Sequence, residues 1–204
     1  MDQKKIESLW REILIEIGED PDRVGLVETP KRIAKMYKEI FRGYDKTQLP
    51  KVTVFPNGDD GLTYTQMIID TGGFYSNCEH HGERFLGKYW FAYIPSKKGN
   101  ILGISKVARV VDYFAAKLQV QERLTQEVVD YLWTELCKDE AHPPIGMALI
   151  MKAKHLCKSA RGVKKEGFMT TSEMRGEFLT PDTAKGNPRE EFLQLVSGEI
   201  GDLK

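Results

Sequence analysis

The segment from Met147 to Lys158 alternates between two kinds of residue, and this alternation restricts the fold more than any other feature of the sequence. One set is mainly apolar and consists of Met147, Leu149, Met151, Ala153, His155 and Cys157. The other set consists of Ala148, Ile150, Lys152, Lys154, Leu156 and Lys158. Side chains of a β-strand point alternately to the two faces of a sheet, so a period of two predicts a strand. We expect His155 and Cys157 on its inward face and the three lysines in water.

Two amphipathic helices are expected before any strand. Apolar residues recur at helical spacing over residues 6–17 and again over 33–41. For the second helix, Thr29 is the expected N-cap and Pro30 the first helical residue, where the missing N–H costs nothing. We interpret residues 1–48 as an N-terminal helical extension.

Strand and helix patterns are mixed from residue 51 onward. In addition to the alternating segment, strands are expected over residues 51–55, 64–70, 87–95 and 168–179. Helices are expected after Ser105 as a cap, over 124–136, and around 192–195. For residues 49–204 this order predicts an α+β domain with a mainly antiparallel sheet.

The composition excludes several classes of protein. Thirty basic residues balance thirty acidic ones in 204 residues, so no global field favours nucleic acid or an anionic membrane. The charged N-terminus lacks the apolar region of a signal peptide, and no apolar run approaches the roughly 18 residues of a membrane span. Three cysteines do not suggest a disulfide scaffold, and the cytoplasm is the expected location.

Five of the seven Cys and His residues lie in two short stretches, "SNCEHHGERF" and "KHLCKSARG". Catalytic zinc usually takes three protein ligands and keeps one position for water. Cys78 and His81, three residues apart in a turn, can converge on one ion, and Cys157 can supply the third ligand. His80 and His155 would then lie beside the metal as proton donors or acceptors. A structural site closed by four ligands is the alternative.

A second group of residues has the chemistry to bind a nucleotide. Lys106 and Arg109 share one face at the start of a helix, which suits phosphate, and Arg161 follows the Cys157 segment. Glu122, beside Gln121 at a helix junction, could accept hydrogen bonds from guanine. Each cation could equally be a solvated surface charge, and Glu122 an ordinary acid of a first helical turn.

Several motifs together resemble the GTP cyclohydrolase I family. They are "CEHH", "GKYWFAYIP", "LGISKVAR", "QVQERLT", "HLCKSARGV" and "TTSEMRGEF", and the likeness runs from about residue 28 to about 196. It implies a tunnelling fold, in which subunits join their antiparallel sheets into a barrel, commonly a decamer of two pentamers with active sites between subunits. The implied reaction converts GTP and water to 7,8-dihydroneopterin triphosphate and formate, with Zn²⁺ as the cofactor.

The resemblance also implies individual roles. The zinc ligands are Cys78, His81 and Cys157, and the unligated histidines are His80 and His155. By resemblance His155 protonates N7 of the base, while His80 and Ser105 assist the later ribose steps. The substrate contacts are Glu122 and Gln121 at guanine and Lys106, Arg109 and Arg161 at the phosphates.

The sequence departs from the family pattern beside the metal motif. The family usually continues with apolar residues after CEHH, whereas this chain has Gly82, Glu83 and Arg84. The pair Gly72-Gly73 is expected to form an irregular entry to the metal loop. Three other functions stay open: a related enzyme acting on another purine or pterin, a zinc-stabilised nucleotide-binding protein that is not an enzyme, and a nucleic-acid binder, which the zero net charge disfavours.

Overall fold

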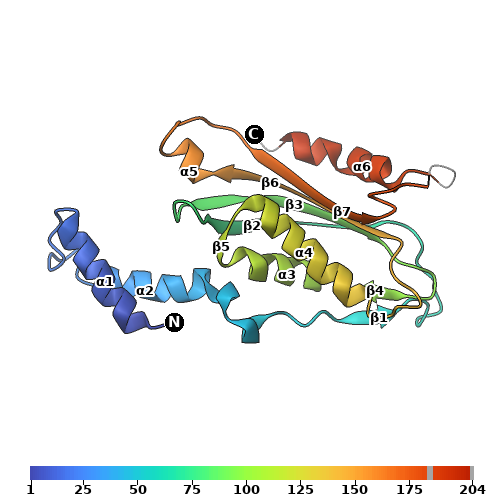
Figure 1. The fold of residues 1–204 in the computed structure, drawn as a ribbon, viewed down its shortest axis with the longest axis horizontal. Helices are drawn as coiled ribbons and strands as arrows, with labels where there is room; N and C mark the ends of the chain where they lie inside the picture. The colour runs from blue at the N-terminus through green and yellow to red at the C-terminus, as the bar shows by residue number, and fades with distance from the viewer. Residues whose placement is uncertain (183–185, 203–204) are drawn as a thin grey trace.

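A five-stranded sheet forms the centre of the molecule (Figure 1). The computed structural model describes residues 1–182 and 186–202. In spatial order the strands are β5 (Leu118–Gln119), β2 (Ile68–Cys78), β3 (Arg84–Ile94), β6 (Gly146–His155) and β7 (Met169–Gly176). Only the short β2–β5 pairing is parallel. The prediction of an α+β fold with a mainly antiparallel sheet is therefore confirmed.

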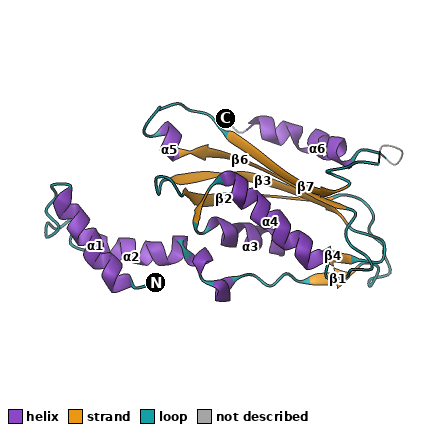
Figure 2. Cartoon of the chain, viewed as in Figure 1, coloured by secondary structure: helices purple, strands orange, loops and turns teal. Residues whose placement is uncertain are grey.

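Helices cover both faces of this sheet (Figure 2). On one face lie α3 (Ser105–Ala115) and α4 (Gln121–Leu136), and on the other lies α6 (Pro188–Asp202). The single turn α5 (Leu156–Ser159) follows β6, and a two-stranded sheet pairs β1 (Val54–Pro56) with β4 (Asn100–Leu102). Thr29 and Ser105, the expected N-caps, are instead the first residues of their helices, and neither helix has a side-chain cap bond.

The main core fills the space between the sheet and the α3–α4 layer. Phe85, Phe91 and Met151 from the strands pack there with Val110 and Val128 from the helices, all almost fully buried. Burial of each large apolar side chain contributes about 1.5–3 kcal/mol. This core fixes the ends of β2, β3 and β6 against the start of α4, where the candidate site lies.

The opposite sheet face is also buried, which corrects one expectation from the sequence. Ala148 and Ile150 pack under α6, and Trp90 Nε1 donates to Glu199 Oε2 at 3.1 Å. Lys152 does not point freely to water, because its Nζ donates to the Ile200 carbonyl at 2.6 Å. The alternating pattern predicted a strand but did not show that a C-terminal helix covers its second face.

Three local predictions about β2 and the end of β6 are wrong. The strand β6 ends at His155, and Cys157 lies in the helical turn α5 rather than on a strand face. The glycine pair lies within a regular β2, where Gly72 pairs with Tyr89. A Cβ atom at Gly72 would lie 2.7 Å from the Tyr89 ring, so the glycine gives this ring its space. The strand expected over 64–70 begins only at Ile68.

The two N-terminal helices lie side by side at one end of the molecule (Figure 1). They are α1 (Gln3–Glu16) and α2 (Thr29–Ile40), and Trp10 meets Tyr37 edge to face with ring centroids 6.2 Å apart. Two short 3₁₀ turns, η1 (Arg42–Tyr44) and η2 (Lys46–Gln48), continue toward β1.

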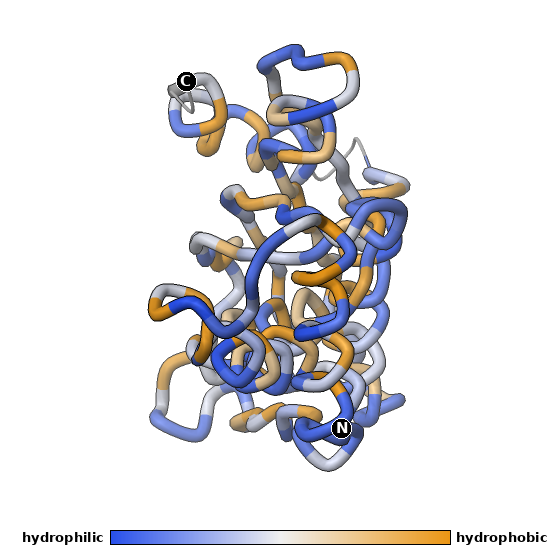
Figure 3. Tube along the Cα trace, turned by 90° about the vertical axis from the view of Figure 1, so that its left-hand side faces the viewer, coloured by the Kyte–Doolittle hydropathy of each residue, from blue (hydrophilic) through white to orange (hydrophobic). Residues whose placement is uncertain are grey.

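No helix in the described part of the chain is long and apolar enough to cross a membrane. Figure 3 shows hydrophobic and hydrophilic residues interleaved along the trace instead of gathered in one long segment.

Candidate active site and metal centre

Three potential zinc ligands meet where β2, the following turn and α5 come together. Cys78 is the buried last residue of β2, His81 lies in the turn, and Cys157 lies in α5. Their ligand atoms lie within 4.8 Å of one another, and Cys78 Sγ is 4.0 Å from His81 Nδ1. Bond lengths of about 2.3 Å to sulfur and 2.0 Å to nitrogen place two tetrahedral ligands about 3.6 Å apart. The Cys₂His donor set therefore fits a zinc ion.

The turn that carries His81 is closed by backbone hydrogen bonds. Gly82 N donates to the Cys78 carbonyl at 2.8 Å, and Cys78 N donates to the Glu83 carbonyl at 2.7 Å. Gly82 has a φ of 69°, a left-handed conformation that favours glycine. Gly82 is the first residue that departs from the family pattern, and the turn explains this departure because its backbone favours glycine there.

His155 is held between an aromatic ring and a buried amide. It is the last residue of β6 and pairs with Phe85 of β3, and the two rings stack with centroids 4.5 Å apart and planes 3° from parallel. Its Nε2 lies 2.9 Å from Gln121 Oε1. Burial lowers the pKa of His155, the Glu122 carboxylate raises it, and Lys158 lowers it further. The ring is therefore oriented and mainly neutral near pH 7.

The hydrogen bonds of Gln121 decide which nitrogen of His155 carries the proton. Gln121 Nε2 donates to the carbonyls of Met151 and Met169 and lies 3.1 Å from Thr171 Oγ1. The amide oxygen is thereby assigned as the atom that faces His155, and since it can only accept, His155 Nε2 must donate. The other ring nitrogen, Nδ1, is then the atom that can accept a proton and pass it on. These contacts engage the Gln121 side chain inside the protein, and its binding to the base beside Glu122 stays a prediction.

The structure brings some of the predicted substrate residues to this site but not others. Glu122 is exposed on the first turn of α4, close enough for its charge to act on His155. Burial and the neighbouring Cys78 raise the pKa of the Cys157 thiol, and the Arg161 guanidinium, which is close enough to act on the thiol, opposes this increase. His80 is exposed in the metal turn, with Nδ1 3.9 Å from Cys78 Sγ.

Ser105, Lys106 and Arg109 lie toward the other end of α3. Ser76 Oγ donates to the Ala115 carbonyl at 2.8 Å, which places the C-terminal end of α3 beside β2 near the metal ligands. At a rise of 1.5 Å per residue, Ser105 lies about 15 Å further along the helix axis. On the same measure Lys106 lies about 14 Å and Arg109 about 9 Å from that end of α3.

Comparison with known proteins adds to this geometry. The GTP cyclohydrolase I family model matches residues 6–197. Over 200 residues the chain is 42% identical to the GTP cyclohydrolase 1 of Caldanaerobacter subterraneus subsp. tengcongensis, which covers 98% of this chain and 99% of that protein. The chain belongs to the GTP cyclohydrolase I family. It is an enzyme of that family.

Other relatives agree over nearly the same length. The GTP cyclohydrolase 1 of Thermoanaerobacter pseudethanolicus is 41% identical over 200 residues, with 98% of this chain and 99% of that protein covered. Among solved structures, the archaeosine synthase QueF-Like in its apo form covers 52% of this chain and 92% of its own, at 15% identity and a TM-score of 0.37. That score is too low to establish a shared fold.

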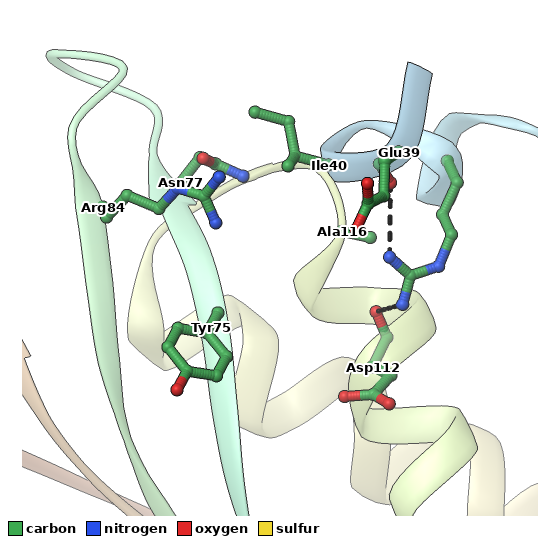
Figure 4. Close-up of a pocket in the computed structure, with 8 residues that line it drawn as sticks. Glu39, Ile40, Tyr75, Asn77, Arg84, Asp112 and Ala116 are labelled. Carbon is green, nitrogen blue, oxygen red and sulfur yellow. Dashed lines mark hydrogen bonds between the residues drawn. The ribbon is translucent and has the colours of Figure 1, made fainter. Parts of the chain in front are cut away.

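Arg84, the third residue that departs from the family pattern, lines a cavity of about 160 Å³ that does not include the metal ligands (Figure 4). Arg84 lines this cavity beside Asn77, opposite α2 and α3. Arg42 closes the other side, where its guanidinium donates to the carbonyls of Glu39 at 3.2 Å and Asp112 at 3.4 Å. Burial raises the pKa of the Asp112 carboxyl group.

Sequence reasoning missed residues that support the site without carrying an obvious motif. Phe85 stacks on His155, and Arg123 pairs with Glu79 in the metal turn. Arg123 belongs to the "QVQERLT" motif and Glu79 to "CEHH". The two residues are 44 positions apart, and no sequence pattern predicts that they form a contact.

Replacing Gln121 by alanine is expected to destabilise the protein by about 1–3 kcal/mol, because two strand carbonyls and His155 lose a buried partner. Urea unfolding followed by circular dichroism measures this difference. Gln126→Ala, at an exposed position of the same helix, is the matched control. Equal unfolding midpoints for the two variants would contradict the role given to Gln121.

Proposed function

We propose that this chain is a zinc-dependent GTP cyclohydrolase I that converts GTP and water to 7,8-dihydroneopterin triphosphate and formate. The observation that carries the proposal is the meeting of a three-ligand Cys₂His cluster with a histidine whose orientation and tautomer are fixed by Gln121. Among the described residues the cluster has three protein ligands, a number that suits a catalytic zinc ion better than a closed structural one.

Cys78, His81 and Cys157 would hold the ion. When bound, zinc supplies a Lewis acid that makes water a nucleophile near neutral pH. The chain contributes the ligand positions, through the last residue of β2, the turn and α5.

His155 is the proton donor in this proposal. Its Nε2 donates to Gln121 and the neutral ring has no proton on Nδ1, so Nδ1 would first take up the proton released by the attacking water. It would then deliver that proton to N7 of the purine as the imidazole ring opens. The nearby Glu122 carboxylate favours the protonated ring and so partly opposes the effect of burial. His80 and Ser105 are proposed to assist the later opening and rearrangement of the ribose.

Glu122 is proposed to select guanine. A carboxylate accepts hydrogen bonds from the N1–H and the 2-amino group of guanine, and adenine has neither donor. The exposure of Glu122 at the start of α4 leaves its oxygens available to a base.

The triphosphate is proposed to bind Arg161 together with Lys106 and Arg109 of a second copy. Lys106 lies about 14 Å and Arg109 about 9 Å along α3 from the end that contacts β2, and this separation supports the arrangement. Open sheet edges support it too. In the described chain β5 pairs with β2 only at Asn77 and Cys78, and β7 pairs only with β6. Unpaired edges are templates for another strand.

We further propose that these edges join in the tunnelling-fold barrel of a homodecamer built from two pentamers. Residues 49–204 would form the barrel subunit, and residues 1–48 the helical extension. The cytoplasmic location stays a prediction from the cysteine content.

Zinc-loaded protein incubated with GTP is expected to release formate and, after oxidation, to give pterin fluorescence. Glu122→Gln is expected to lower kcat/KM for GTP by about 10- to 100-fold, because it removes hydrogen bonds to a charged acceptor. Formate is measured enzymatically and pterin by fluorescence after chromatography.

Glu135→Gln, at the far end of the same helix, removes a charge without touching the site and serves as the control. Tight GTP binding by the wild type with neither product would refute the enzymatic proposal and favour a nucleotide-binding protein. Equal kcat/KM for Glu122→Gln and the control would refute the role of Glu122.

A further inference from the structure

The turn that presents His81 is exposed, although a metal ligand must be held in place. Every residue from Glu79 to Glu83 is exposed. Besides the two bonds that close the turn, Glu79 N donates to the Gln119 carbonyl at 3.0 Å. The Glu79 carboxylate also accepts a hydrogen bond from the Arg123 guanidinium, which ties the turn to α4 by a side chain.

Arg123 is itself held in one orientation by β5. Its Nε donates to Gln119 Oε1 at 2.8 Å, and its Nη2 also donates to the Leu118 carbonyl at 3.2 Å. Gln119 is fully buried, and its Nε2 donates to Glu127 Oε2 at 2.7 Å and to the Phe114 carbonyl at 3.0 Å. A guanidinium fixed at several nitrogens presents a defined fork to a carboxylate.

The first turn of α4 therefore contacts three separate parts of the site through consecutive residues. Gln121 orients His155, Glu122 faces solvent where a base would bind, and Arg123 holds the metal turn. Successive side chains on a helix point about 100° apart, so one rigid turn can serve all three directions.

We propose that Arg123, acting through Glu79, is a positioning residue. It fixes the positions of the metal ligands His81 and Cys78 relative to His155 and Glu122. This inference rests on the proposed function and adds a residue to it. Arg123 contacts the metal turn itself through Glu79, and it also holds Leu118 and Gln119 of β5, which pairs with the end of β2. A partly exposed ion pair contributes little to global stability, so the main consequence of breaking it is a displaced metal turn.

The test compares Glu79→Gln, Arg123→Gln, Arg123→Lys and the Glu79→Gln/Arg123→Gln double variant with the wild type. Zinc affinity is measured by competition with a chromophoric chelator, and the visible spectrum of the Co²⁺-loaded protein reports ligand geometry. The kcat and KM for GTP and the urea unfolding of the metal-free protein complete the set. Arg175→Gln is the matched control, since Arg175 pairs with Asp130 on the same helix α4.

Arg123→Gln is expected to weaken zinc binding by about 10-fold and to lower kcat similarly, with KM for GTP unchanged. The Co²⁺ spectrum should change, and the double variant should be no worse than Arg123→Gln alone. Arg123→Lys, which keeps the charge but not the fork, should recover part of the affinity. Metal-free Glu79→Gln should unfold at the same urea concentration as the Arg175→Gln control. Metal-free Arg123→Gln should be less stable, because the buried Gln119 amide oxygen also loses its donor.

Two results would overturn the proposal: unchanged zinc affinity and Co²⁺ spectrum in Glu79→Gln and Arg123→Gln, or losses in Glu79→Gln that simply follow a lower stability of the metal-free protein. The affinity and spectrum do not depend on turnover. A wild type that binds zinc tightly but makes no product would therefore refute the proposed function. Weaker zinc binding by Arg123→Gln would still support the positioning role in that case.

Discussion

Replacing Cys157 by alanine is expected to leave the protein without stoichiometric zinc and without formate release. The ligand atoms of Cys78, His81 and Cys157 lie within 4.8 Å of one another, so the loss of one thiolate leaves two protein ligands. This loss should exceed the roughly 10- to 100-fold weakening that follows the removal of an outer partner. Metal content after dialysis, measured by elemental analysis, and formate release check the prediction.

Cys137→Ala is the matched control for the missing thiol, because Cys137 terminates α4 and belongs to no described metal cluster. Chelation of zinc from the wild type should reproduce the loss, and added zinc should reverse it only in proteins that keep Cys157. Stoichiometric zinc in Cys157→Ala would show that the ligand set is wrong.

His155→Ala is expected to retain zinc yet to yield neither formate nor pterin. Removal of a positioned general acid typically costs about 10²- to 10⁴-fold in rate. The ring stacks on Phe85 and is not among the three clustered ligands, so the metal should remain in place. Single-turnover formate release, with zinc content measured on the same sample, separates this variant from Cys157→Ala.

The control for a lost imidazole is His142→Ala, since His142 lies in the loop after α4 beside Asp139. Circular dichroism should show the same fold for both histidine variants. Formate release by His155→Ala at the rate of the control would remove His155 from the mechanism, and loss of zinc in this variant would place it among the ligands.

The amino-acid sequence alone predicted the elements and the chemistry that depend on local pattern. The period of two in the segment ending at His155 predicted β6, and helical spacing predicted α1, α2, α3 and α4. The rarity of Cys and His predicted that Cys78, His81 and Cys157 belong together, and the structure places them in one cluster. These features are local because backbone periodicity and ligand chemistry are properties of short segments.

Tertiary structure decided the contacts that orient those groups. Gln121 reaches His155 across 34 residues, because β3 sets the register of β6 and the main core places the start of α4 beside its end. The same docking brings Arg123 to Glu79. The chain also turns into α5 before Cys157, and Lys106 lies about 14 Å along α3 from the end that contacts β2. A periodic pattern states which face of a strand or helix is buried. It does not state which residue of a distant element lies opposite, since strand register and helix docking come from the packing of the whole domain.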